Sequence, residues 1–218
     1  MLSFTEENYL KAIYKIHERT KSAASTNAIA EIMTTTAASV TDMMRKLAQK
    51  EMIQYEKYKG SRLTAQGAVV ATALIRRHRL WETFLADKLN FSWEEVHELA
   101  EQLEHINSEK LIERLDEFLD FPKYDPHGDP IPNADGKFTI REQLMLSQLQ
   151  IGEKGALIGV KNHNDEFLSY LNELKIKLGS EFEVINKVLY DKSIKVHLNN
   201  QEIVLSEKVS TNLMIKKL

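Results

Sequence analysis

Residues 25–55 read STNAIAEIMTTTAASVTDMMRKLAQKEMIQY and predict a short capped helix, a turn near Thr34–Thr36 and a second helix. One face of the second helix is apolar and consists of Val40, Met43, Met44 and Leu47. The opposite face carries Ala38, Asp42, Arg45 and Gln49. Because the two faces separate cleanly, the apolar face is expected in a core and the polar face in solvent.

The next stretch, IQYEKYKGSRLT, alternates in polarity around a Lys-Gly-Ser turn and predicts a β-hairpin with Lys57, Lys59 and Arg62 near its tip. Two short helices followed by a basic hairpin form the plan of a winged helix-turn-helix. In that plan the second helix enters the major groove and the wing contacts phosphates. Helix pairs and exposed lysines also occur in small domains without DNA, but the order of these elements favours DNA binding.

The candidate DNA contacts are the outward positions of the second helix and the wing. Asp42 is the weakest base-reading candidate, below Ser39, Thr41 and Arg45, because phosphates repel a carboxylate, although it can accept from a cytosine amino group. The full set is Thr36, Ala38, Ser39, Thr41, Asp42, Arg45, Lys46, Lys57, Lys59 and Arg62.

The amino-acid composition limits the kinds of metal site and reactive group that the chain can form. The chain has 218 residues, 43% of them hydrophobic and 28% charged, with a formal net charge of −3 and no cysteine. Disulfides, zinc-thiolate sites and thiol nucleophiles are therefore excluded, and any metal must be held by nitrogen and oxygen. The N-terminus lacks the apolar core of a signal peptide and no apolar run is long enough to span a membrane, so a soluble cytoplasmic protein is expected.

The composition and the hydrophobic pattern of the chain change after residue 120. All four prolines fall in FPKYDPHGDPIPNADGKF, which predicts an extended connector. Beyond it, the runs ALIGV, KIKLGSEFEVI, SIKVHL and EIVL, punctuated by glycines and an Asn199-Asn200 turn, predict a small β-barrel.

Residues 96–106, VHELAEQLEHI, place His97, Glu101, Glu104 and His105 within an arc of roughly 100° if they form one helix. Alone, such an arc is more typical of a solvent-facing surface. The preceding helix adds His78 and Glu82 at i, i+4, a pair able to bind one ion. Mixed imidazole and carboxylate ligands favour Mn²⁺ and Fe²⁺.

The ordered set of a winged helix-turn-helix, HRLWE, H-x3-E-x2-E-H, DPHGDPIP and a small barrel resembles the DtxR/MntR family of metal-dependent bacterial transcriptional repressors. The resemblance covers essentially the whole chain, including EENYLKAIYKI and LGSEFEVI. It implies a mainly α fold with a C-terminal β domain. The implied domains are a winged helix-turn-helix at 1–72, a helical dimerisation and metal-binding domain at 73–140 with a Pro-rich connector at 121–138, and an SH3-like β-barrel at 141–218.

The resemblance also implies function. The protein would be a homodimeric repressor of metal-ion homeostasis that binds double-stranded operator DNA, and not an enzyme. A primary metal site would use Asn8, Glu101, Glu104 and His105. A second site would use His78, Glu82 and His97, completed by Asp125 and His127 of the connector and by His163 and Asp165 of the barrel.

The resemblance does not decide between Mn(II) and Fe(II). Glu101 favours Mn(II), because the iron-sensing branch tends to have Cys there, but the three-domain layout is closer to that iron-sensing branch. Fe(II) is therefore possible, and Zn(II) or other divalent ions could occupy the sites in vitro. The chain departs from the family at Asn8, where Asp or Met is usual, and at Lys11, where the manganese branch has Glu.

Two other functions remain as alternatives. Two neighbouring ions held by His and carboxylate could activate water in a metal-dependent hydrolase, although neither a nucleophile nor a phosphate-binding loop is recognisable. A winged-helix regulator that senses a small organic ligand would leave the His/Glu row as a solvated surface.

Overall fold

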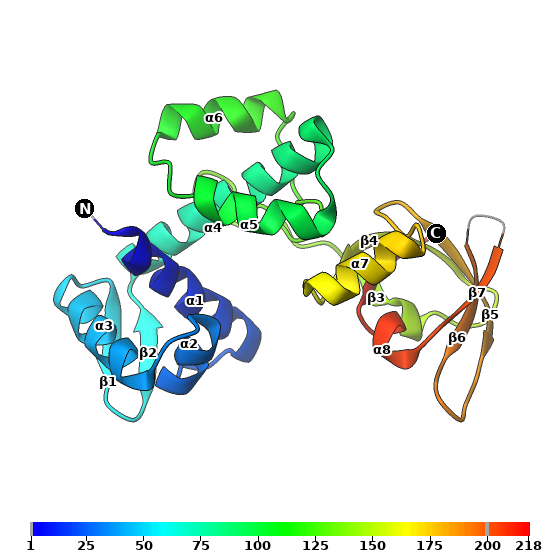
Figure 1. The fold of residues 1–218 in the computed structure, drawn as a ribbon, viewed down its shortest axis with the longest axis horizontal. Coiled ribbons are helices and arrows are strands. Elements are labelled where there is room, and N and C mark those ends of the chain that lie inside the picture. Colours follow the sequence, from blue (N-terminus) through cyan, green and yellow to red (C-terminus); the bar gives the residue numbers. More distant parts are fainter. Residues whose placement is uncertain (1, 199–200) are drawn as a thin grey trace. The chain divides into compact units, whose positions relative to one another are not determined.

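The computed structural model describes residues 2–198 and 201–218 (Figure 1). Its internal contacts divide the chain into two compact units. The first unit contains the chain up to His78 together with Gln102–Glu109 and Pro132–Phe138. The second contains Arg79–Glu101, Lys110–Ile131 and Thr139–Leu218. None of the described helices is both long and apolar enough to cross a membrane.

The first unit is a winged helix-turn-helix. Its elements are α1 (Phe4–Thr20), α2 (Thr26–Ile32), α3 (Ala37–Gln49), β1 (Ile53–Glu56), β2 (Gly60–Leu63) and the first half of α4 (Ala65–Leu89). Side-chain caps start each of the first three helices: Ser3 accepts from the N–H of Glu6, Ser25 from Ala28 and Thr36 from Ser39. The local signals in residues 25–64 therefore produce the predicted elements.

The core of this unit confirms the predicted faces of α3. Val40, Met44 and Leu47 are fully buried, and Met43 packs at the edge of the same cluster. The strands β1 and β2 pair antiparallel from Ile53↔Leu63 to Glu56↔Gly60. Gly60 has φ +94°, and a Cβ there would lie 2.6 Å from the Ala24 carbonyl oxygen, so the wing can pack against Ala24 only with glycine at this position.

A buried carboxylate ties α1 to the end of α3. Glu6 is 1% exposed, and its Oε1 lies 3.2 Å from Lys46 Nζ and 2.7 Å from Lys50 Nζ. Burial opposes ionisation of Glu6, but hydrogen bonds from Lys50, the Ser3 N–H and Lys46 outweigh it and lower the pKa to about 2.

Replacing Glu6 by Gln is expected to destabilise the protein by about 1 to 2 kcal/mol at neutral pH, since both ammonium groups are over a third exposed and solvent screens the pairs. A depressed carboxyl pKa stabilises above the ordinary value of 4.5, and this contribution is lost as the pH falls towards 2. The difference in unfolding free energy between wild type and Glu6→Gln, measured with urea, should therefore shrink below pH 4.5. Glu18→Gln, an exposed change on α1, should show no such trend; a constant difference would contradict the assignment.

The helices of the second unit include the second half of α4 and most of α5 (Trp93–Leu103) and α6 (Glu109–Phe118). One detail differs from the sequence prediction. The helix predicted over residues 96–106 ends at Leu103, so Glu104 and His105 lie in the turn that follows it. The prediction that all four side chains share one helical arc is therefore wrong for these two residues.

The C-terminal β domain is one antiparallel sheet in the order β3-β8-β4-β5-β6-β7, with α7 and α8 drawn beside it in Figure 1. Its strands are β3 (Leu144–Met145), β4 (Lys154–Val160), β5 (Glu181–Lys187), β6 (Ile194–Leu198), β7 (Gln201–Leu205) and β8 (Leu213–Lys217). A 3-10 helix (Leu146–Gln148), α7 (Asp165–Glu173) and α8 (Glu207–Ser210) complete the domain. The predicted runs at 156–160, 193–198 and 202–205 are confirmed, while the run from residue 175 becomes a strand only at Glu181. The predicted Asn199-Asn200 turn lies outside the described residues.

The proline-rich connector contains no helix, as predicted, but the prediction that it is extended is wrong between residues 124 and 130. Tyr124 forms an antiparallel bridge with Pro130, and the Asp125 N–H donates to the Asp129 carbonyl at 3.0 Å. A tight turn at Gly128 (φ +88°) closes this loop, and Asp125, Pro126 and His127 are buried in it. The loop can fold back on itself because these backbone hydrogen bonds replace the ones that the buried groups would otherwise make with water.

Candidate metal centres and DNA-binding surface

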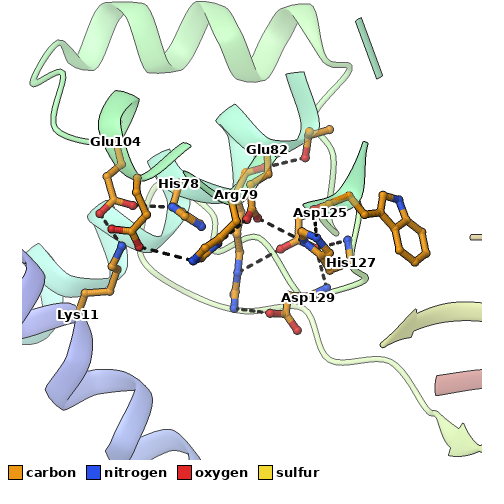
Figure 2. Close-up of polar contacts among 12 residues, drawn as sticks. Lys11, His78, Arg79, Glu82, Glu104, Asp125, His127 and Asp129 are labelled. Carbon is orange, nitrogen blue, oxygen red and sulfur yellow. Dashed lines mark hydrogen bonds and ion pairs between the residues drawn. The ribbon is translucent and has the colours of Figure 1, made fainter. Parts of the chain in front are cut away.

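A buried cluster of the second unit, here called the connector cluster, consists of Glu82, Asp125 and His127. Glu82 comes from α4, and the other two come from the folded connector (Figure 2). One ligand atom from each residue lies within 4.8 Å of the others. The cluster thus offers two carboxylates and one imidazole to a single point.

The connector fixes the direction of the Asp125 carboxylate. Its Oδ1 accepts the backbone N–H groups of His127 at 2.9 Å and Asp129 at 3.0 Å. Its Oδ2 lies 3.5 Å from Nε of Arg79, which also donates to the Pro130 carbonyl at 2.5 Å and pairs with Asp129 at 3.2 Å. Arg79 therefore offsets part of the negative charge while one Asp125 oxygen keeps a fixed orientation.

The electrostatics of the connector cluster favour a bound cation. Burial raises the pKa of Asp125, and the charges of Glu82 and Asp129 raise it further. Burial alone would lower the pKa of His127, but the Glu82 carboxylate and the Asp125 charge outweigh it and raise the pKa to about 9. Two buried carboxylates repel one another and have lost most of their hydration. A bound divalent ion would therefore stabilise them.

Two of the other predicted ligands, His97 and His163, lie next to the connector cluster. His97, half exposed on α5, places Nδ1 3.1 Å from Glu82 Oε1 and Nε2 3.9 Å from Glu101. The ring of His163 lies 5.0 Å from that of His127, and its Nε2 lies 3.1 Å from the Val160 carbonyl oxygen. Asp165 is the exposed first residue of α7.

The first unit holds a second group of polar side chains, here called the α1 cluster: Glu7, Asn8, Lys11, His78, Glu104 and His105. At its centre Glu104 is 0% exposed. Its Oε2 lies 2.6 Å from His78 Nδ1, and its Oε1 lies 2.5 Å from Lys11 Nζ (Figure 2). His78, predicted for the second site, thus contacts a residue predicted for the primary one.

The rest of the α1 cluster surrounds His105. Its Nδ1 lies 2.7 Å from Glu7 Oε2, and Phe4 stacks on its ring at 4.5 Å. Asn8 Oδ1 is buried and has no hydrogen-bond partner among the described residues. A buried oxygen without a partner, one residue after Glu7 on α1, fits a hard divalent ion, which prefers oxygen ligands.

Two residues of these clusters, Glu7 and Arg79, and the pairing of Lys11 with Glu104 were not predicted from the sequence. Glu7 and Arg79 are adjacent in sequence to the predicted ligands Asn8 and His78, and no other feature of the sequence points to them. Lys11 and Glu104 are separated by 93 residues, and no local pattern predicts that pair.

The predicted DNA-reading face is accessible. The positions Thr36, Ala38, Ser39, Asp42, Arg45 and Lys46 are exposed, as are Lys57, Lys59 and Arg62 on the wing, whereas Thr41 is partly buried. Asp42 and Arg45 form an exposed ion pair at 3.2 Å. On the wing, Lys57 lies 5.0 Å from the Tyr58 ring centre, and Lys59 pairs with Glu56 at 2.7 Å.

Three family models match consecutive parts of the chain. Residues 1–61 match the iron dependent repressor N-terminal DNA-binding domain, and residues 64–133 match the iron dependent repressor metal-binding and dimerisation domain. Residues 144–217 match the FeoA domain. These matches confirm the predicted order of DNA-binding, dimerisation and C-terminal β domains.

Known proteins are similar over most of the chain. The iron-dependent repressor IdeR of Mycobacterium leprae (strain TN) is 33% identical over 180 residues, 78% of each chain. Matches to some other curated relatives span only about half of those proteins, 54% for the diphtheria toxin repressor of Corynebacterium jeikeium (strain K411).

A solved manganese-dependent transcriptional repressor in complex with manganese is 32% identical, with a TM-score of 0.83 over 98% of this chain and 100% of that one. ScaR with bound Zn²⁺ is 31% identical, with a TM-score of 0.74 over 98% and 99%. The chain is thus a metal-dependent DNA-binding repressor of metal homeostasis and not an enzyme, in agreement with the expected cytoplasmic location. It belongs to the DtxR/IdeR/MntR family of metal-dependent transcriptional repressors.

Proposed function

We propose that Mn(II) activates this repressor by binding at the connector cluster. The observation that carries the proposal is the convergence of Glu82, Asp125 and His127 within 4.8 Å at a fully buried point. A chain without cysteine offers only oxygen and nitrogen ligands, and carboxylate-rich sets suit Mn(II) and Fe(II) better than thiolate-seeking ions. His97 and His163, which flank the cluster, are the proposed additional ligands, and Asp165 remains a prediction.

Asn8, Glu104 and His105 are the proposed ligands of a second ion in the α1 cluster, and Glu101 stays a prediction for it. The buried Asn8 oxygen supports this assignment because an ion would satisfy it. A bound divalent ion would supply a bridge between α1 and the turn after α5. Through that bridge Asn8 and His105 would restrict the motion of α1 within the DNA-binding unit, which favours the DNA-bound state.

Coupling of about 1 to 3 kcal/mol would change operator affinity about 5- to 150-fold. Reciprocity then requires operator DNA to tighten metal binding by the same factor. Equal Mn(II) affinity with and without operator would therefore rule out the proposed coupling.

Fluorescence anisotropy tests the choice of metal. The duplex would be one that the manganese-loaded protein selects from random-sequence DNA, titrated with protein in Mn(II), Fe(II), Zn(II) or chelator. We expect the tightest binding with Mn(II) at matched free-ion concentrations and the weakest with chelator. A response to Fe(II) but not Mn(II) would overturn the metal assignment, and no response to any ion would overturn metal activation.

We also propose that α3 reads bases through Ser39, Thr41 and Arg45 and that the wing contacts phosphates. Replacing Lys57 by Gln is expected to weaken binding similarly for all sequences and to reduce the slope of log affinity against log salt by about 1, because one counterion fewer is released. The exposed barrel change Lys192→Gln is a control with the same loss of charge. An unchanged salt slope in Lys57→Gln would place the wing away from DNA.

A further inference from the structure

Lys11 is a buried ammonium group in the α1 cluster. Its side chain is 6% exposed, and Nζ lies 2.5 Å from Oε1 of the fully buried Glu104. Lysine is almost never buried without a charged partner, because leaving water costs an ion several kcal/mol. The contact therefore compensates two charges at once, one from α1 and one from the turn after α5.

The partners of the neighbouring groups leave little room for a divalent ion at Glu104. The second carboxylate oxygen of Glu104 already contacts His78 at 2.6 Å. His105 is engaged by Glu7 at 2.7 Å, and its Nε2 stays 3.8 Å from Glu104 Oε1, where Lys11 sits. Among these possible ligands, Asn8 Oδ1 alone has no hydrogen-bond partner within the described part of the chain.

We infer that Lys11 is the built-in cation of the α1 cluster, and that a divalent ion binds there only by displacing its ammonium group from Glu104. The inference rests on the proposed metal activation and deepens it. The ammonium supplies one positive charge at the position where an ion would bridge α1 to Glu104. In the metal-free protein, α1 is therefore already held to Glu104.

The two clusters are expected to differ in their affinity for a divalent ion. The connector cluster is the tighter site, because its two buried carboxylates converge with an imidazole that can give up a proton to an incoming ion, whereas a tethered ammonium group cannot leave. The α1 cluster is the weaker one, because an incoming ion must exchange with Lys11 and then bear the repulsion of a nearby ammonium group. Lys11 thus sets the metal affinity of the α1 cluster without being a ligand.

Mn(II) titration followed by electron paramagnetic resonance of the free ion tests the inference on the full-length protein. Wild type is expected to bind one Mn(II) per chain tightly and a second weakly. In Lys11→Gln the second ion should bind roughly tenfold more tightly or better. Lys15→Gln, an exposed change of the same charge on α1, should behave as wild type.

Thermal unfolding gives a readout that does not depend on DNA. Metal-free Lys11→Gln should melt below wild type because Glu104 loses its cation, and Mn(II) should raise its melting temperature more than that of wild type. Lys11→Met serves the same purpose if the Gln variant does not fold. Identical second-site affinity and identical Mn(II)-induced shifts in wild type and the Lys11 variants would overturn the inference.

The same titration separates failure of the inference from failure of the proposed function. If wild type binds no Mn(II) tightly, the proposed function fails at the connector cluster. If Asp125→Asn removes the tight ion while Lys11→Gln leaves the weak one unchanged, the proposed function stands and the role of Lys11 does not.

Discussion

At Mn(II) concentrations that fill only the tight site of the wild type, Asp125→Asn is expected to bind operator about 5- to 150-fold more weakly than wild type, near the level measured with chelator. The substitution removes one of two buried carboxylates from the connector cluster. It keeps the shape of the side chain, and an amide oxygen can still accept the N–H groups of His127 and Asp129. The connector turn should therefore persist.

Stability separates a lost ligand from a damaged fold. Burial and the charge of Glu82 raise the pKa of Asp125, so its ionised form is disfavoured in the folded protein. A neutral Asn removes that repulsion, and the metal-free variant should melt at the wild-type temperature or above it. The Mn(II)-induced rise in melting temperature should shrink at the same time, because a ligand stabilises only in proportion to its binding.

Asp129→Asn is the matched control for this experiment. Asp129 lies in the same turn and carries the same charge, but its carboxylate pairs with Arg79 rather than joining the connector cluster. Anisotropy titrations with Mn(II) should show a near wild-type response for Asp129→Asn and little response for Asp125→Asn. Full activation of Asp125→Asn by Mn(II) would exclude this carboxylate as a ligand.

The elements that sequence predicts well here are those with local signals. Ser25 and Thr36 cap consecutive helices, and the apolar positions of α3 recur with the helical period, so the helix-turn-helix needs no long-range information. The wing is equally local, because its turn falls within a few residues. The predicted core positions Val40, Met44 and Leu47 are accordingly fully buried.

The end of α5 and the partners of the residues that follow it could not be predicted from the sequence. Helical periodicity extends past Leu103 in the sequence, yet the helix ends there and sends Glu104 and His105 to partners on α1. Helix ends are poorly specified by hydrophobic pattern alone. The carboxylate of Glu104 is held by Lys11 and His78, which lie 93 and 26 residues away. Pairings of this kind depend on tertiary packing, which a single sequence does not display.

Family resemblance supplied the ligand residue types but not their partners. It grouped Asp125 and His127 with Glu82, and the structure brings these three together. It did not indicate that the connector would fold back at residues 124–130, because proline content predicts an extended chain without helix. The backbone hydrogen bonds of that turn fix the Asp125 side chain, so the geometry of the site depends on the turn as much as on the ligands.

Gly128→Ala is therefore expected to disrupt both the stability of the second unit and its connector cluster. Gly128 has φ +88°, and an added Cβ would overlap the Ile158 carbonyl oxygen and the Gly159 Cα of β4. Neither is the end of a flexible side chain, so the backbone itself must move. Left-handed strain and overpacking together should cost about 2 to 6 kcal/mol.

Loss of metal affinity should accompany this loss of stability. The Val160 N–H donates to the His127 carbonyl at 2.8 Å, and Arg141 donates to the carbonyls of both Gly128 and Ile158, so two links join the turn to β4 next to the substitution. Moving the turn away from β4 would displace Asp125 and His127 from Glu82. Mn(II) should then bind more weakly even at temperatures where the variant is folded.

Gly152→Ala separates the two causes. Gly152 has nearly the same φ, +84°, but nothing lies within 4 Å of an added Cβ, so this control carries the conformational strain without the overlap. Differential scanning calorimetry should rank wild type above Gly152→Ala and Gly152→Ala above Gly128→Ala, with Mn(II) affinity reduced only in Gly128→Ala. Equal melting temperatures for the two variants would mean that the contact between the connector turn and β4 adds nothing to stability, and unchanged Mn(II) affinity in Gly128→Ala would mean that the turn does not position the connector cluster.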